Sequence, residues 1–156
     1  MKFSLLIVLL VALLASGALA SSQATGPGKQ QVLYGHAKSV TRVGNRFELR
    51  FDPAWWLSGV AAERACGCKP VPNDHVVIDE THRLLTFVVQ KDARVSVLVR
   101  GNRLGTATIS VAELAQILQG KNPQHRRLLE PNAGFWIRIL QTYPSPVVSL
   151  DQQYQP

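Results

Sequence analysis

Apolar and polar residues alternate along several short segments of this chain. In 46–52, Phe47, Leu49 and Phe51 fall on one face and charged residues fall on the other. Such alternation is typical of a β-strand with one buried and one solvated face. Comparable segments recur between turn residues, and we expect strands at 32–43, 46–52, 75–78, 84–89, 94–100, 106–109, 135–142 and 147–150, the last at a sheet edge.

A helical period marks 110–119, where four apolar residues recur at i, i+3, i+4 and i+7. Ser110 and Glu113 fit a capping box, in which each side chain accepts a hydrogen bond from a free backbone N–H. Gly120 follows as a C-terminal cap. The sequence therefore predicts one well-defined helix at about 110–119.

A second and weaker helix is expected at 54–65. Pro53 would end the preceding strand and is well tolerated at the first position of a helix, with Asp52 as the N-cap. Gly59 weakens this helix. The following segment, 66–74, holds two prolines and a glycine, and we expect an irregular loop there. A turn is also expected at 91–93, between two of the strands.

Short strands joined by tight turns favour antiparallel pairing. With a single good helix late in the order, the sequence predicts a mainly β, α+β domain. Two architectures fit: a small antiparallel barrel, OB-like, or a curved sheet with the helix packed on it. We expect a flexible leader at 21–30, the domain at 31–150 and a tail at 151–156.

The N-terminus has the three parts of a secretory signal peptide. Lys2 gives the positive charge, 3–14 is apolar apart from one serine, and Ala18 and Ala20 are the small residues that precede cleavage. We therefore expect 1–20 to be removed and the product to be secreted or periplasmic. An uncleaved anchor is less favoured, because spanning a bilayer takes about 20 apolar residues. No later segment is apolar enough to do so.

The chain is basic, and loss of Lys2 lowers its net charge only from +7 to +6. A positive charge favours acidic partners, although it also serves solubility alone. For an exported protein the partner classes are an acidic polymer, a lipid headgroup or another envelope protein. Intracellular nucleic acid is not expected.

Large aromatic and basic side chains supply the candidate binding surface. Neighbours in a strand point to opposite faces, so one member of an aromatic pair can face solvent. An exposed ring beside arginine stacks on sugars or bases, although core packing is the usual role of such rings. The basic segment joins the last aromatic pair if the chain folds back, and the candidate residues are Trp55, Trp56, Lys121, His125, Arg126, Arg127 and Trp136.

Cys66 and Cys68 are the only cysteines. In an oxidising compartment we expect them to form a disulfide, strained and easily reduced because it closes a very small ring. A metal site with His75 or His82 is an alternative, since thiolate and imidazole suit zinc or copper(I), but no standard zinc spacing is present. Thiol–disulfide exchange is another, although the usual Cys-x-x-Cys motif is missing.

No catalytic motif stands out. No serine lies in a Gly-x-Ser-x-Gly turn, and scattered histidines and carboxylates occur in every small protein. Asp74, Asp79 and Glu80 lack the spacing of a calcium loop and are typical of turns. We expect no cofactor.

Three segments carry a resemblance to a group of small exported bacterial proteins. They are Phe-Asp-Pro-Ala-Trp-Trp-Leu-Ser-Gly at 51–59, Val-Pro-Asn-Asp-His at 71–75 and Ser-Leu-Asp-Gln-Gln-Tyr at 149–154. The resemblance implies an envelope or secreted location, and no activity comes with it. The leading hypothesis is a non-enzymatic binding domain for acidic envelope or extracellular ligands. A small hydrolase or thiol-redox enzyme and a metal-binding protein are the alternatives.

Overall fold

A computed structural model describes residues 28–80, 83–101, 103–130 and 133–155. The expected signal peptide at 1–20 lies outside these residues, as does most of the expected leader. In chain order the elements are β1 (Gln30–Val43), β2 (Arg46–Ser58), α1 (Gly59–Cys66), the 3-10 helix η1 (Pro72–Asp74), β3 (His75–Ile78), β4 (Leu85–Arg100), β5 (Leu104–Ile109), α2 (Val111–Ile117), β6 (Phe135–Leu140) and β7 (Val147–Gln152).

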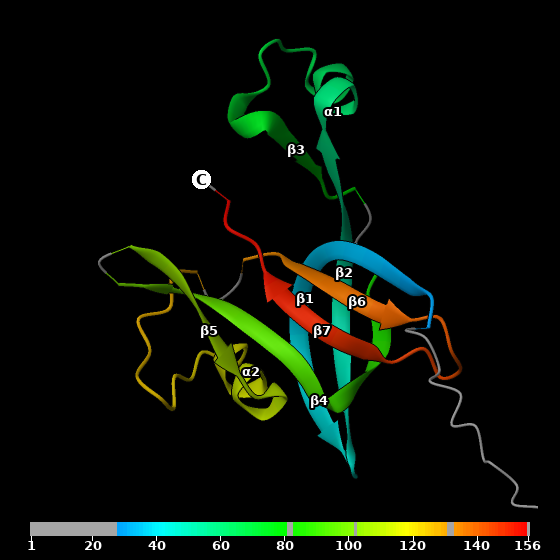
Figure 1. Ribbon diagram of the computed structural model, residues 1–156, viewed down its shortest axis with the longest axis vertical. Coiled ribbons are helices and arrows are strands. Elements are labelled where there is room, and N and C mark those ends of the chain that lie inside the picture. The colour runs from blue at the N-terminus through cyan, green and yellow to red at the C-terminus, as the bar shows by residue number, and fades with distance from the viewer. Residues whose placement is uncertain (1–27, 81–82, 102, 131–132, 156) are drawn as a thin grey trace, which may run out of the picture.

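Five strands close into a barrel (Figure 1). Strand β1 pairs with β2, β2 with β4, β4 with β7, β7 with β6, and β6 with β1. Only β4 and β7 are parallel, so the barrel is mixed where the sequence indicated antiparallel pairing throughout. The predicted mainly β, α+β class is confirmed. This strand order, with a helix between the third and fourth barrel strands, fits a Greek-key barrel of the OB kind.

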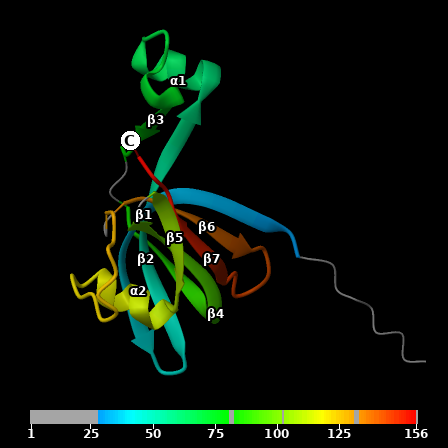
Figure 2. The ribbon, with the colours of Figure 1, turned by 60° about the vertical axis from the view of Figure 1, so that its left-hand side comes forward.

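Two strands lie outside the barrel. Strand β5 pairs with the second half of β4, and β3 pairs with the last residues of β2. Because β2 continues beyond the barrel, residues 55–78 form a projection made of the end of β2, α1, η1 and β3, which we call the arm. Figure 2 shows the arm standing away from the barrel, with α1 near its tip.

The apolar faces of the strands fill the barrel. Leu49 and Phe51 are fully buried, as the alternation in 46–52 predicted, and Phe135 and Ile137 of β6 alternate in the same way with exposed or half-buried neighbours. The helix α2 packs against this core through three apolar side chains, Val111, Leu114 and Ile117.

Helix α2 begins where its capping residues predicted. Ser110 Oγ accepts a hydrogen bond from the backbone N–H of Glu113 at 3.0 Å. The Glu113 carboxylate does not complete the expected capping box but accepts from Arg126 Nε at 2.6 Å. Gly120, with φ of +79°, lies just after the helix and adopts the left-handed conformation that glycine favours.

The helix expected at 54–65 is wrong over its first half, because β2 continues through Pro53 to Ser58. Alternate residues of a strand direct their backbone groups to opposite edges. Pro53 directs its nitrogen away from β1, at a point where pairing with β4 has already ended at Phe51. The missing N–H therefore removes no ladder hydrogen bond, which is where a strand tolerates proline.

The turn expected at 91–93 is also wrong, because β4 is one continuous strand. Its first half pairs with β2 and its second half with β5. The register with β7 shifts between Val89 and Arg94, so the polar stretch is an irregularity within the strand. Strand β7 lies between β4 and β6 rather than at an edge. It continues through Gln152, two residues into the segment expected to be a tail.

Candidate functional site

Strands β1 and β2 separate at one end of the barrel. Their pairing ends at Tyr34–Ala54. Beyond that pair, β1 stays with β6, and β2 continues into the arm with β3. We call this divergence, Gln30–Tyr34 of β1 and Ala54–Ser58 of β2, the fork. Figure 2 shows the two strands parting, with β2 entering the arm and β1 following the barrel wall.

Gly35 sets the geometry at the base of the fork. A Cβ atom at this position would overlap the Asp52 carbonyl oxygen and lie 2.8 Å from Pro53 Cα. Any larger residue would therefore push β1 away from β2. Glycine allows the two backbones to approach closely just before they diverge.

A hollow of about 440 Å³ opens in the fork. It is lined by residues 31–34 of β1 and 53–56 of β2, with Leu85 and Trp136 completing the wall. All three tryptophans of the chain are among these residues. A mostly apolar hollow of this size with a few polar groups is the usual form of a ligand site.

Two of the three tryptophans belong to a packed aromatic cluster on the outer face of the barrel. Trp56 stacks on His75 with ring centroids 3.9 Å apart and an interplanar angle of 6°. The ring centroid of Tyr34 lies 5.0 Å from that of Trp56 and 4.9 Å from that of Trp136, and the two tryptophan centroids are 5.7 Å apart. The cluster joins β1, β2, β3 and β6 and thereby fixes the arm relative to the barrel.

The C-terminal residues hold this cluster in place. Gln155 Nε2 donates to Tyr34 Oη at 2.6 Å, and Trp136 Nε1 donates to Gln153 Oε1 at 3.0 Å. Burial raises the pKa of Tyr34, because it disfavours the charged phenolate. Residues 153–155, expected to belong to a free tail, are thus packed on the outer side of the fork.

Trp55 is different from its neighbour. It points to the opposite face of β2 and is 69% exposed. Its ring is therefore the most exposed of the three tryptophans, whereas Trp56 and Trp136 are half-buried. The expectation that one member of the Trp55–Trp56 pair faces solvent agrees with this placement.

Polar side chains gather at the base of the fork. A β-bulge at Lys38 brings its Nζ to 3.1 Å from Asp52 Oδ2. His36, the register partner of Asp52, has its Nδ1 3.8 Å from Asp79 Oδ2. The Asp52 carboxylate is buried, and its Oδ1 has no hydrogen-bond partner among the described residues. These contacts tie β1 to β2 and to the end of β3.

The basic candidates lie elsewhere. Lys121, His125, Arg126 and Arg127 follow α2 in the long segment before β6, beside α2 in Figure 1. The Arg126 side chain is bound to Glu113, and this hydrogen bond raises the pKa of Arg126. The other three are exposed. None of the four lines the hollow that holds the tryptophans.

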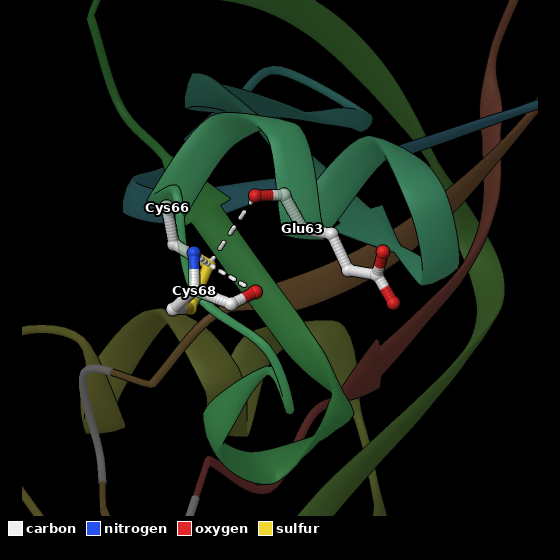
Figure 3. The surroundings of a disulfide bond; sticks show 3 residues. All are labelled: Glu63, Cys66 and Cys68. Atoms are coloured by element: carbon white, nitrogen blue, oxygen red, sulfur yellow. Dashed lines mark hydrogen bonds between the residues drawn. A yellow bond between two sulfur atoms is a disulfide. The ribbon is translucent and has the colours of Figure 1, made fainter.

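Cys66 and Cys68 form a disulfide at the end of α1 in the arm, so the predicted bond is confirmed (Figure 3). The Cys68 backbone N–H donates to Cys66 Sγ at 3.3 Å, and that sulfur lies 3.8 Å from the Glu63 carbonyl oxygen. Both sulfurs are therefore unavailable as thiolate ligands. His75, the proposed third ligand, stacks on Trp56, with Nδ1 2.7 Å from the Asn73 carbonyl oxygen.

Other candidate chemistry is sparse. The described residues contain no group of three or more histidine, cysteine or carboxylate side chains arranged to hold a metal ion. His82 lies outside the described residues. No helix within the described ranges is long and apolar enough to cross a membrane.

Comparison with models of protein families, with curated proteins and with solved structures finds no match to this chain. Sequence reasoning had singled out the three tryptophans but not Tyr34, His75 as a stacking partner, or the two C-terminal glutamines. Their only signal in the sequence is aromatic or polar character, because the residues that they contact are distant along the chain.

Proposed function

We propose that this chain is an exported, non-enzymatic binding domain that takes its ligand in the fork. The observation that carries the proposal is the hollow lined by all three tryptophans, of which Trp55 is the most exposed. Isolated exposed rings need no explanation. An exposed tryptophan at the wall of an apolar hollow is a typical anchor for a binding partner.

Charge supports a partner with acidic groups. Lys29 immediately precedes the β1 side of the fork, and Arg138 is the register partner of Val32 on β6. Both side chains are exposed. Together with the net charge of the chain, they favour an acidic envelope or extracellular ligand. Export is inferred from the N-terminal pattern, and the Cys66–Cys68 disulfide agrees with an oxidising compartment.

The alternative functions have less support. A thiol-redox enzyme needs a stabilised thiolate, yet Cys66 lies at the C-terminal end of α1, where the helix dipole disfavours negative charge. A metal-binding protein would need the two sulfurs that the disulfide already joins. A hydrolase has no motif in the sequence to suggest it.

Intrinsic tryptophan fluorescence tests the proposal directly, because every tryptophan lines the hollow in the fork. The chain from Ser21 onward is titrated at physiological salt with heparin, anionic lipid vesicles and acidic peptides. We expect at least one probe to change the emission and Trp55→Ala to weaken that binding at least tenfold. Val60→Ala is the matched control, since Val60 is also exposed on the arm but lies outside the hollow.

Three outcomes would contradict the fork as the binding site. Binding that Trp55→Ala leaves unchanged would place the ligand elsewhere on the surface. If Arg127→Ala abolished that binding instead, the basic segment after α2 would be the site. No response to any of these probes would count against the fork as a binding site.

A further inference from the structure

The β1 side of the fork carries backbone groups with no strand partner. The Lys29 carbonyl oxygen accepts from Gln141 N–H at 2.8 Å, so Lys29 and every second residue after it direct their backbone groups toward β6. Gln30 and Val32 therefore direct their N–H and C=O groups to the other edge. Pairing with β2 on that edge begins only at Tyr34. The groups of Gln30 and Val32 thus point into the fork.

The β2 side presents the complementary arrangement. Ala54 is the last residue of β2 paired with β1, so its backbone groups face β1 by the same alternation. Trp56, two residues later, directs its own groups to the same edge. Strand β3 lies on the opposite edge of β2 and does not cover them. The backbone groups of Val32 and Trp56 therefore have no partner strand within the described residues.

We propose that the fork binds an extended polypeptide segment, which adds as a strand between β1 and β2. The inference rests on the proposed function, because it names the ligand class for the same site. Open donors and acceptors repeat every second residue, which is the period of a strand, about 6.6 Å. Because β1 and β2 are antiparallel, the added strand runs antiparallel to one of them and parallel to the other. Strand addition to a free edge is a recurrent mode of peptide recognition.

The composition of the edges supports this occupant. Proteins usually protect free edges with charged residues, proline or bulges. Here Gln30–Leu33 carries no charge, and Val32 is 52% exposed. Pro53 lies in β2 but directs its nitrogen away from the fork. Among the described residues, two uncharged edges facing one another are thus left open for pairing.

The aromatic groups favour a peptide over a sugar. Sugar binding by stacking needs free ring faces, and the rings of Trp56 and Trp136 are already packed against their neighbours. Trp55 offers the most open ring of the three, which suits one apolar side chain of a strand. With Lys29 and Arg138 exposed beside the β1 edge, the ligand is an apolar extended segment with an acidic residue at its end.

The probes are synthetic nonapeptides rich in valine and threonine with aspartate at both ends, screened as an array against the chain from Ser21 onward. The strongest binder is then made again with N-methyl groups on alternate amides, which removes backbone donors and leaves the side chains unchanged. We expect N-methylation to weaken binding at least tenfold, measured by tryptophan fluorescence. Unchanged binding would overturn strand addition.

A variant of the protein tests the same hydrogen bonds from the other side. Val32→Pro removes an N–H that faces the fork and bonds to no other strand, so the barrel should still fold. We expect peptide binding to fall at least tenfold, whereas Val32→Thr, which keeps the N–H, should bind like the parent. If Val32→Pro fails to fold, hydrogen exchange decides: the Val32 and Trp56 amides of the parent should gain protection only with peptide.

The outcomes separate this inference from the proposed function. If an acidic polysaccharide such as heparin binds with Trp55 dependence and no peptide does, the fork is a binding site but not for a strand. If neither probe binds, both proposals fail. Peptide binding that Val32→Pro leaves intact, with no added protection of the two amides, overturns the inference alone.

Discussion

The neighbouring tryptophans of β2 allow a sharp prediction from a single element. Trp55 is exposed, so Trp55→Ala should change the free energy of unfolding by no more than about 0.5 kcal/mol. Trp56 is packed against Tyr34, Trp136 and His75. Two identical substitutions at adjacent positions should therefore have very different effects.

The magnitude for Trp56 follows from its contacts. Each aromatic pair contributes about 0.5–1.5 kcal/mol beyond area burial, so Tyr34 and Trp136 together account for about 1–3 kcal/mol. Truncating a fully buried tryptophan costs about 3–5 kcal/mol. Trp56 is only half-buried, and we expect Trp56→Ala to lower the free energy of unfolding by about 2–4 kcal/mol.

The assay is urea unfolding followed by far-UV circular dichroism, which does not depend on the tryptophan removed. Equal destabilisation by Trp55→Ala and Trp56→Ala would refute the reasoning. Side chains on opposite faces of a strand cannot both be buried in one cluster, so that result would mean β2 does not continue past Pro53. The helix expected at 54–65 would then be the better description.

Three further predictions test other parts of the structure. Gly35→Ala should destabilise the domain by about 1–3 kcal/mol in urea unfolding, because the added Cβ overlaps the Asp52 carbonyl oxygen; an unchanged midpoint would contradict the close approach. Tyr34 has a raised pKa in the folded state, so its stabilising effect is complete below about pH 10 and is lost as pH rises through the folded pKa. Tyr34→Phe should abolish that alkaline loss of thermal stability. A pH profile of the variant identical to that of the parent would contradict a role of the Tyr34 hydroxyl in this loss. Ser110→Ala should cost about 1 kcal/mol through loss of the bond to Glu113 N–H, and no change in thermal melting would contradict the cap.

Local sequence patterns correctly predict those elements that depend only on residues close together in the chain. The alternation in 46–52 and the Ser110 cap depend on residues a few positions apart, and both predictions are confirmed. The helix predicted after Pro53 and the turn predicted at 91–93 are both wrong. A strand tolerates such residues where its partner strands change, as they do at these two points. That information lies in strands far away along the chain.

The candidate site also depends on contacts between residues that are distant in the sequence. The tryptophans are conspicuous in composition, but Tyr34 meets Trp136 across a pairing between residues about a hundred positions apart. The free edges of the fork arise because β1 and β2 leave each other for different partners, β6 and β3. No local pattern encodes where two paired strands separate, so the binding site could be suspected from the sequence but not located.

The central claim is that the ligand occupies the fork, and the three indole N–H signals of the ¹⁵N-labelled chain test it most directly. Because every tryptophan lines the hollow, a bound ligand should shift these signals in an NMR titration, that of Trp55 most of all. A ligand that binds and saturates the protein while all three indole signals stay in place would contradict the account.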